Sequence, residues 1–442
     1  MEIIQFEDKN LAHYSYAIIS NREIALVDPA RDPQPYYDLA KEKDAEIRAI
    51  IETHPHADFV SSHKEIHEST GAMIYVSKLL GAGYPHQTFD DGDEIKLGDV
   101  ILKSLNTPGH SPDSISIVAQ ENGKDYAVFS GDTLFIGDCG RPDLRETAGH
   151  LTSQRRDLAK QMFHSLRDKM LPLADNVLVY PAHGAGSLCG KGLSSANVST
   201  IGTEKASNWS LQKSSEEDFI NELLANQPFV PKYFVHSVEL NKIGAPNYKE
   251  SISNVKISDH LPGDLSDEII IDTRNEAEFK KGYLPGSINL MVETKFETWL
   301  GSIVAPEEKF YLIGESKEVL EGLINRIAKI GYEDQVAGAF VSGEISGNQI
   351  PKINVDQFSK SPDDYTIVDI RNANEVLQKR IFKNSIDIPL PELRERVGEI
   401  PKSKPIVVHC AGGYRSAAGA SIINEVIKDA QVYDLSYAIS KF

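Results

Sequence analysis

Short apolar runs separated by polar turns fill the first half of the chain, and most have the length of a strand. Such runs cover residues 3–5, 14–19, 23–27 and 47–51. Longer amphipathic stretches at 35–43, 60–69 and 154–170 predict helices, because their apolar residues recur at helical spacing. Strands and helices mixed in this way predict an αββα sandwich.

The middle of the chain adds two further patterns. Apolar, β-branched runs at 114–118 and 126–129 flank the turn Glu121-Asn122-Gly123-Lys124, which is typical of a hairpin. A further strand is predicted over 176–180. Residues 205–255 are polar and rich in turn residues, with one helical segment at 216–226. We therefore expect them to form the tail of the first domain and a linker.

Two related segments follow. Ile269-Ile270-Ile271-Asp272-Thr273-Arg274-Asn275 and Ile367-Val368-Asp369-Ile370-Arg371-Asn372 are both strand-like runs that end in Asp-x-Arg-Asn. Each is followed by a helix start that contains a glutamate, and later strands are predicted at 310–313 and 406–409. The chain therefore carries an internal repeat of two α/β units.

Composition narrows the class of protein. The 442 residues predict two to four domains, and the formal net charge of -19 disfavours nucleic acid or an anionic membrane as a partner. The three cysteines fit a reducing compartment without a disulfide framework. The acidic N-terminus lacks a signal-peptide pattern, and apolar runs stay well short of the roughly 18 residues that span a bilayer. We expect a soluble cytoplasmic protein.

The strongest chemical signal is the turn Thr53-His54-Pro55-His56-Ala57-Asp58-Phe59 at the end of the run 47–51. Two imidazoles and a carboxylate on one turn suit a borderline transition metal. The alternative is a polar turn whose histidines have ordinary hydrogen-bond partners. Three further pieces favour the metal, since each ends a strand-like run: Thr107-Pro108-Gly109-His110, Ser130-Gly131-Asp132-Thr133 and Tyr180-Pro181-Ala182-His183.

These four pieces resemble the metallo-β-lactamase superfamily over residues 1–245, the fold shared by glyoxalase II and the persulfide dioxygenases. The resemblance implies that His54, His56 and His110 face one ion. It also implies that Asp58, the next residue and His183 face a second ion, with Asp132 bridging. The next residue here is Phe59, which cannot ligate a metal. A mononuclear site remains, and the hydrolytic chemistry of glyoxalase II, which generally uses a paired-metal water, is disfavoured.

Persulfide dioxygenases imply one Fe(II), non-heme and mononuclear, held here by His54, His110 and Asp132. Two imidazoles and a carboxylate leave positions open for the substrate sulfur and O2. The remaining three polar residues of the motif would orient ligands and substrate: His56, Asp58 and His183. His63 is predicted to be a helix residue and not a ligand.

Three more residues near this motif are candidates for substrate binding. The loop Phe135-Ile136-Gly137-Asp138-Cys139-Gly140-Arg141-Pro142-Asp143 resembles the family's substrate loop, in which Arg141 would meet a substrate carboxylate. The alternative is an ion pair of Arg141 with Asp138 or Asp143. Tyr180 either lines the same pocket or packs a strand end. Cys189, with Lys191 nearby to favour its thiolate, is either a relay thiol or an inert loop cysteine.

The second α/β unit contains Val407-Val408-His409-Cys410-Ala411-Gly412-Gly413-Tyr414-Arg415-Ser416, which resembles the rhodanese active-site loop, Cys-x-x-Gly-x-Arg. In this loop, catalysis is assigned to Cys410, Gly413 and Arg415. Inward-pointing amides and a helix N-terminus favour a thiolate or persulfide anion, and Arg415 adds charge for sulfite or thiosulfate. The first unit has Gly314-Glu315-Ser316 there, without a cysteine. It resembles a silent rhodanese domain that serves as a scaffold or as a surface for substrate delivery.

The whole chain therefore resembles the bacterial persulfide dioxygenase–sulfurtransferase fusions of the CstB type. Its predicted domains are 1–247, a metallo-β-lactamase-fold dioxygenase; 248–352, a silent rhodanese; and 353–442, an active rhodanese. This order implies α/β multidomain architecture and oxidation of a low-molecular-weight thiol persulfide to sulfite. Cys410 persulfide would then convert sulfite to thiosulfate, and this transfer can also run in reverse.

Two other functions stay open from the sequence. One is a thioester hydrolase of the glyoxalase II kind fused to a rhodanese, and the other is a non-enzymatic persulfide carrier or sensor. The thiol carrier is not identified by the sequence: coenzyme A, cysteine, bacillithiol and glutathione types are all compatible. Homo-oligomerisation is likewise left open.

Overall fold

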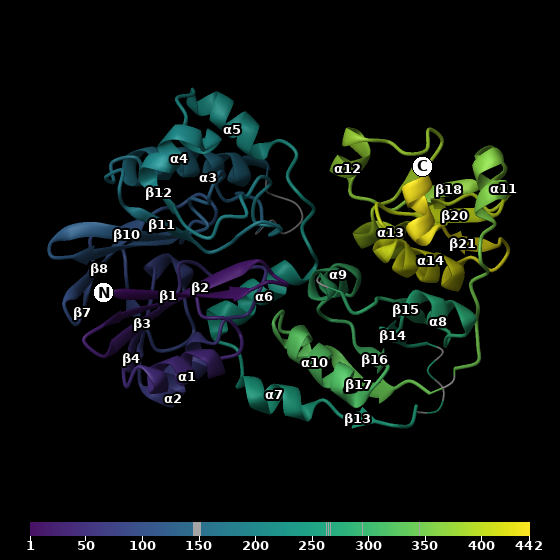
Figure 1. The fold of residues 1–442 in the computed structure, drawn as a ribbon, viewed down its shortest axis with the longest axis horizontal. Helices are drawn as coiled ribbons and strands as arrows, with labels where there is room; N and C mark the ends of the chain where they lie inside the picture. Colours follow the sequence, from purple (N-terminus) through teal and green to yellow (C-terminus); the bar gives the residue numbers. More distant parts are fainter. Residues whose placement is uncertain (145–151, 262, 264, 266, 294, 344) are drawn as a thin grey trace. The chain divides into compact units, whose positions relative to one another are not determined.

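The chain divides into two compact units. The computed structural model describes residues 1–144, 152–261, 263, 265, 267–293, 295–343 and 345–442. The first unit comprises Met1–Glu250 with Ala328–Gly331, and the second comprises Ser251–Ile327 with Tyr332–Phe442 (Figure 1). The domain limits at residues 247 and 352 stay predictions.

Two six-stranded sheets form the centre of the first unit. The first sheet runs in the order β1 (Glu2–Asp8), β2 (His13–Ser20), β3 (Glu23–Val27), β4 (Glu46–Ile51), β5 (Met73–Val76) and β6 (Gln87–Thr88). The second runs in the order β12 (Ser199–Thr200), β11 (Leu178–Pro181), β10 (Lys124–Gly131), β9 (Ile115–Glu121), β8 (Val100–Asn106) and β7 (Glu94–Leu97).

Three apolar layers hold this unit together. One lies between the sheets and includes Ile18, Leu102 and Phe129. The helices α1 (Gln34–Glu42) and α2 (His63–Thr70) cover the outer face of the first sheet, where Leu39 and Ile66 are buried. The helices α3 (Thr152–Ser165), α4 (Ile201–Ser207) and α5 (Glu216–Leu224) cover the second sheet. The predicted αββα sandwich is confirmed.

Local structure follows the sequence closely in places and departs from it in others. The predicted hairpin is present between β9 and β10, and positive φ angles of 52° at Asn122 and 71° at Gly123 fit a type I′ turn. The helix expected from residue 60 begins only at His63. The helix expected to continue to residue 170 instead changes to a π-helical turn over Leu166–Met170.

Residues 205–255, expected to form the tail of the first domain and a linker with one helix, contain more helix than the sequence predicted. Beyond α5, this stretch contains α6 (Tyr233–Ile243) and α7 (Tyr248–Asn254). The side-chain amide of Asn241 in α6 donates to the carbonyl groups of His56 and Phe59, both at 2.8 Å, and accepts from the Ser61 amide at 2.8 Å. The helix therefore supports the histidine turn, because it satisfies buried backbone groups that would otherwise lack partners.

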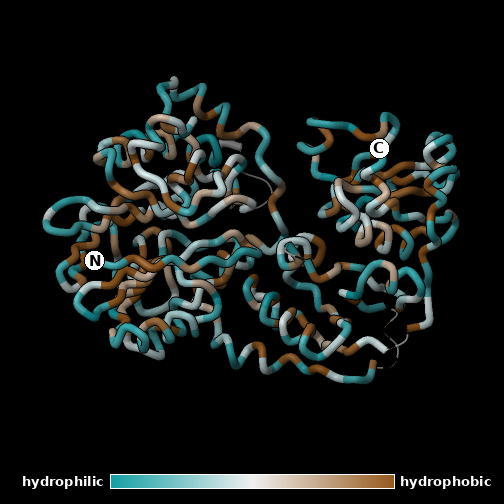
Figure 2. Tube along the Cα trace, viewed as in Figure 1, coloured by the Kyte–Doolittle hydropathy of each residue, from teal (hydrophilic) through white to brown (hydrophobic). Residues whose placement is uncertain are grey.

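The second unit contains two parallel sheets, one for each repeat. The first has the order β13 (Ile257–Ser258), β17 (Val336–Val341), β16 (Phe310–Gly314), β14 (Ile269–Asp272), β15 (Ser287–Asn289). The second has the order β19 (Ile386–Asp387), β18 (Thr366–Asp369), β20 (Ile406–His409), β21 (Val432–Asp434). Figure 2 shows hydrophobic residues gathered on the central strands of this last domain.

Helices flank both sheets of the second unit. They are α8 (Glu276–Lys281), α9 (Phe296–Ile303), α10 (Lys317–Ala328), α11 (Val355–Lys360), α12 (Ala373–Gln378), α13 (Leu393–Arg396) and α14 (Tyr414–Val426). In each repeat the Asp-x-Arg motif at the strand end forms an ion pair within itself. Arg274 binds Asp272 and Arg371 binds Asp369, both at 2.6 Å. The two units are therefore similar in structure as well as in sequence. Among the described residues, the helices are all too short or too polar to cross a membrane.

Candidate active sites

Three loops of the first unit bring the predicted metal ligands together. His54 follows β4, His110 follows β8 and Asp132 follows β10. Their ligand atoms all lie within 4.8 Å of one another, and all three side chains are buried. Nε2 of His110 lies 3.4 Å and Nε2 of His54 lies 3.8 Å from Oδ2 of Asp132. In the described part of the chain this oxygen accepts no hydrogen bond.

The tautomer of His54 follows from its neighbours. The Thr53 hydroxyl donates to Oδ2 of Asp28 at 2.8 Å, because a carboxylate can only accept. The same hydroxyl oxygen lies 2.9 Å from Nδ1 of His54 and must accept there. His54 therefore carries its proton on Nδ1 and directs the lone pair of Nε2 at Asp132.

Asp132 is held in place by His183. Nδ1 of His183 donates to Oδ1 of Asp132 at 2.8 Å, and Nε2 lies 2.8 Å from Oδ2 of Asp58. Burial alone would raise the pKa of Asp132, but the charge and the hydrogen bond of His183 hold it well below its usual range. Burial likewise opposes protonation of His183, yet Asp132 and Asp58 raise its pKa well above the ordinary value. The aspartate is thus kept anionic.

Two glycines allow the loops to approach this closely. A Cβ at Gly140 would lie 2.0 Å from the carbonyl oxygen of Asp132 and 3.0 Å from Nδ1 of His110. Gly131 has a φ of 53°, and a Cβ there would lie 2.7 Å from the Thr53 hydroxyl. Any larger residue would push the ligand loops apart.

The residues present fit a metal ion. Two imidazole nitrogens and a carboxylate oxygen form a donor set for a transition metal. The buried Oδ2 of Asp132 faces both imidazoles and lacks a hydrogen bond, and such an atom is costly unless a cation satisfies it.

The ring of His56 packs against that of His54, with centroids 4.2 Å apart, but its Nε2 faces other carboxylates. Its Nε2 is 3.1 Å from Oδ1 of Asp28 and 3.5 Å from Oε2 of Glu52, in a second buried group. Phe59 packs between rings, with its centroid 3.8 Å from that of His13 and 4.3 Å from that of His56. Sequence reasoning missed His13 and Glu52 as neighbours of the site. The sequence signal that could have identified them is their position beside an apolar run: His13 precedes the run 14–19, and Glu52 follows the run 47–51.

Cys189, expected near the metal motif, lies in a buried group with Asp58 and His183. Burial, followed by the charges of Asp58 and Asp132, raises the pKa of its thiol well above the ordinary value. Lys191 does not counter this, because its ammonium group binds Glu222 at 3.0 Å. Lys191 is thus engaged with Glu222, and the role of Cys189 as a relay thiol stays a prediction.

Arg141 and Tyr180 both have partners within the protein, and their roles in substrate binding stay predictions. Arg141 is buried and pairs with Asp143 through two hydrogen bonds of 2.6 and 2.7 Å. Its backbone amide also donates to the Cys189 carbonyl at 3.0 Å, so it fixes the cysteine loop instead of presenting a free guanidinium. Tyr180 stacks on Phe129 at 5.3 Å within the sheet and packs a strand.

The second candidate site is the loop between β20 and α14. Cys410 is buried, and the Gly413 amide donates to its sulfur at 3.1 Å. Gly413 has a φ of 101°, a conformation that favours glycine. The Arg415 guanidinium forms a bidentate pair with Glu375 at 2.6 and 2.7 Å. Burial opposes its charge, but Glu375 holds the pKa of Arg415 above the usual value.

The equivalent loop of the first repeat cannot form such a cradle. Only Glu315 and Ser316 separate the end of β16 from the start of α10, whereas four residues separate β20 from α14. A Cβ at Gly314 would lie 2.8 Å from the side chain of Leu320. The end of β16 therefore carries no cysteine, and a side chain at Gly314 would crowd Leu320.

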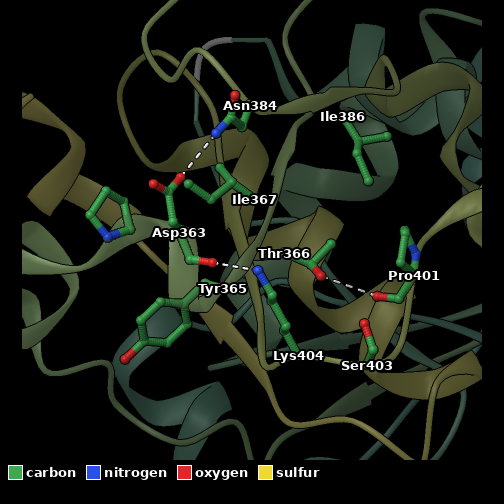
Figure 3. A pocket seen from close by; sticks show the side chains of 10 residues that line it. Asp363, Tyr365, Thr366, Ile367, Asn384, Ile386, Pro401, Ser403 and Lys404 are labelled. Carbon is green, nitrogen blue, oxygen red and sulfur yellow. Dashed lines mark hydrogen bonds between the residues drawn. The ribbon is translucent and has the colours of Figure 1, made fainter.

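A pocket of about 440 Å³ lies elsewhere in the last domain, at the starting ends of β18 and β20 (Figure 3). Its polar groups bind one another: Asn384 donates to Asp363 at 2.9 Å, and Lys404 donates to the Asp363 carbonyl at 2.5 Å. Cys410 follows the opposite end of β20. The pocket is therefore separate from the loop that contains Cys410.

Comparisons with known proteins identify relatives of both kinds of domain. A family model described as the metallo-beta-lactamase superfamily matches residues 9–183, and one for the rhodanese-like domain matches 257–337 and 354–442. The mitochondrial persulfide dioxygenase ETHE1 of Bos taurus is 30% identical over 220 residues, which are 48% of this chain and 76% of that protein. The chain belongs to the persulfide dioxygenase family. Two rhodanese-like domains follow, as in a persulfide dioxygenase–rhodanese fusion.

Two further similar proteins are a hydrolase and a metallo-beta-lactamase. A hydroxyacylglutathione hydrolase of Prochlorococcus marinus (strain NATL1A) is 34% identical over 169 residues, which are 37% of this chain and 62% of that protein. The crystal structure of a metallo-beta-lactamase from Staphylococcus aureus subsp. aureus COL has a TM-score of 0.70 at 32% identity, covering 77% of this chain and 99% of that chain. The relatives and the buried His54–His110–Asp132 group together support an enzyme of the persulfide dioxygenase family that uses a metal.

Proposed function

We propose that this persulfide dioxygenase–rhodanese fusion oxidises a low-molecular-weight thiol persulfide with O2 and then forms thiosulfate. One Fe(II) would be held by His54, His110 and Asp132. In the first reaction, persulfide, O2 and water give thiol and sulfite. In the second, sulfane sulfur carried on Cys410 is transferred to that sulfite.

The observation that carries the first reaction is the buried Oδ2 of Asp132, which faces Nε2 of His110 at 3.4 Å and Nε2 of His54 at 3.8 Å. Two imidazoles and one carboxylate are the donor set of non-heme iron oxygenases, with open positions on the other side. Bound Fe(II) would supply electrons to O2, which Zn²⁺ cannot do, and would offer a coordination position for the substrate sulfur.

The chain's own residues prepare this donor set. Thr53 keeps the proton of His54 on Nδ1, so Nε2 stays available. His183 keeps its proton on Nδ1 against Oδ1 of Asp132, so Oδ2 is directed to the two imidazoles.

Sulfur transfer at Cys410 balances without an external oxidant. The donor persulfide passes its terminal sulfur to the Cys410 thiolate and leaves as a thiolate. Sulfite then attacks the terminal sulfur of the Cys410 persulfide, a new S–S bond forms in thiosulfate, and the electron pair of the broken S–S bond returns to the Cys410 sulfur. The Gly413 amide, which donates to that sulfur, stabilises the returning negative charge.

A thioester hydrolase is the competing function, because hydroxyacylglutathione hydrolases are among the similar proteins. Phe59 argues against it. A paired-metal hydrolase needs a ligand at that position, and the phenyl ring instead packs on His13 and His56. A non-enzymatic persulfide carrier would not need the buried His54–His110–Asp132 group at all.

The test combines metal analysis with oxygen uptake in anaerobically prepared protein. His110→Ala should lose iron and O2 consumption with a thiol persulfide, while sulfur transfer from thiosulfate to cyanide continues. His164→Ala is the matched control, because His164 is exposed and pairs with surface carboxylates. Two tightly bound zinc ions per chain, or thioester hydrolysis without O2 uptake, would overturn the proposal.

A further inference from the structure

A second group of buried donor atoms lies in the first unit, and it shares no residue with the His54–His110–Asp132 group. Asp28 follows β3, Glu52 follows β4, and His56 belongs to the histidine turn. Their ligand atoms all lie within 4.8 Å of one another, and all three side chains are buried. The loops at the ends of two neighbouring strands therefore bring two carboxylates and one imidazole together.

The distances within this group fit a single ion. Nε2 of His56 lies 3.1 Å from Oδ1 of Asp28 and 3.5 Å from Oε2 of Glu52. An ion with bonds of roughly 2.0–2.2 Å separates neighbouring ligand atoms by roughly 2.8–3.6 Å, from octahedral to tetrahedral geometry. Both distances fall in this range, so the three atoms could bind one ion with little movement.

Hydrogen bonds do not account for the group. In the part of the chain that the structure describes, Oε2 of Glu52 and both ring nitrogens of His56 have no hydrogen-bond partner. The ion pairs of Asp28 and Glu52 among these residues are all with imidazoles. A proton on Glu52 is the alternative to a cation, but at Oε2 it would have no acceptor. Two buried carboxylates in this state are costly, and a bound cation removes the cost.

Neighbouring groups hold the donor atoms in position. The Thr53 amide donates to Oδ1 of Asp28 at 2.7 Å, and the Thr53 hydroxyl donates to Oδ2 at 2.8 Å. The Ser61 hydroxyl donates to Oε1 of Glu52 at 2.7 Å, which leaves Oε2 toward His56. Contacts of this kind orient the ligands of a metal site before the ion binds.

We propose that Asp28, Glu52 and His56 form a second cation site, which takes one divalent transition ion in addition to the ion at His54, His110 and Asp132. Two carboxylate oxygens and one imidazole suit a hard to borderline ion such as Mn²⁺. The inference goes beyond the proposed reactions and does not depend on them, because it concerns a different set of side chains.

The test uses Mn²⁺ as the probe and the full chain freed of metal with a chelator. Free Mn²⁺ gives an EPR signal that is lost on binding, so the signal counts bound ions. His110→Ala should bind one Mn²⁺ per chain. Adding Glu52→Gln should raise its Kd more than about tenfold, because losing a ligand costs at least as much as losing a residue that orients one. Adding Glu68→Gln is the matched control, since Glu68 is exposed on α2.

A milder variant covers the case in which Glu52→Gln folds poorly, which near-UV circular dichroism would reveal. Ser61→Ala keeps the charge of Glu52 but removes the hydroxyl that orients it, and it should raise the Kd about tenfold in the His110→Ala protein. Mn²⁺ should also raise the Tm of His110→Ala, since it binds the folded state. No Mn²⁺ bound by His110→Ala, or equal Kd values with Glu52→Gln and Glu68→Gln, would overturn the inference.

Oxygen uptake distinguishes this inference from the proposed function. If the iron-loaded wild type consumes no O2 with a thiol persulfide while His110→Ala still binds one Mn²⁺, the proposed function fails and the second cation site stands. If the wild type consumes O2 but His110→Ala binds no Mn²⁺, the function stands and the second site is ruled out.

Discussion

The side-chain oxygen of Thr53 lies 2.9 Å from Nδ1 of His54. Because the same oxygen donates its proton to Asp28, the contact fixes which nitrogen of His54 carries the proton. Thr53 binds no metal itself, but it determines which nitrogen of His54 would bind the proposed metal ion. Asp28, at the end of β3, holds Thr53 in this orientation, since the Thr53 amide also donates to it at 2.7 Å.

The first prediction follows from this contact. Thr53→Val keeps the shape of the side chain but removes the hydroxyl, so His54 loses the partner that orients it. Iron affinity should fall by about 10–100-fold, as for other residues that orient a metal ligand. Competition with a chelator measures this affinity, and Thr53→Ser should behave as the wild type. Unchanged iron binding in Thr53→Val would show that the tautomer of His54 is set elsewhere.

The second prediction concerns the space at Gly140. Gly140→Ala should disrupt the metal site, because the new Cβ would lie 2.0 Å from the Asp132 carbonyl oxygen. We expect at least a tenfold loss of iron affinity, measured by metal content after dialysis, and a lower Tm for the first unit. Gly192→Ala is the control, since its Cβ would approach no atom closer than 3.7 Å. Similar iron contents in both variants would contradict the role of Gly140.

Much of this site could be predicted because the chemistry sits at strand ends. His54, His110, Asp132 and His183 each follow an apolar run of strand length, and neighbouring strands bring such ends together. Cys410 was predictable for a further reason. The spacing from Cys410 to Arg415 is a local property of one loop, and a local pattern can be recognised without knowledge of the packing.

The parts that could not be predicted depend on contacts between distant segments. Apolar residues occur on both faces of α6, since Phe234 and Val238 are buried while Val235 and Ile243 are exposed, so no single stripe marks this helix. Asn241 supports the histidine turn from more than a hundred residues away in sequence. Arg141 had two possible partners, and only the fold determines that it pairs with Asp143.

The third prediction concerns pH. Burial would raise the pKa of Glu375, but the pair with Arg415 holds it below the usual value. A carboxyl group with a lowered pKa stabilises the folded state above its unfolded pKa, roughly 4.3, and this contribution disappears as pH falls through the folded pKa. Glu375→Gln should therefore be less stable than the wild type at pH 7 by about 1–2 kcal/mol, since Glu375 is one third exposed and partly screened.

That difference should vanish in acid. Urea unfolding followed by Trp299 fluorescence in a Trp209→Phe background reports on the second unit. The stability gap between the parent protein and its Glu375→Gln variant should shrink steadily below about pH 4.5, because both then carry a neutral side chain. Glu399→Gln is the control, as Glu399 pairs with Arg396 on the surface and should change stability little. A gap that is independent of pH would mean that the ion pair is not its source.

The last prediction concerns Cys410 and the identity of the product. Cys410→Ser keeps the shape of the loop but replaces the thiol with a hydroxyl that cannot form a persulfide. This variant should still consume O2 with a thiol persulfide, while its product shifts from thiosulfate to sulfite. It should also lose all thiosulfate:cyanide transfer, because the end of β16 carries no cysteine. A separate rhodanese should restore thiosulfate, after correction for the uncatalysed reaction of sulfite with persulfide. If Cys410→Ser abolished O2 uptake instead, Cys410 would be loading the metal site, and the order of the two reactions would be reversed.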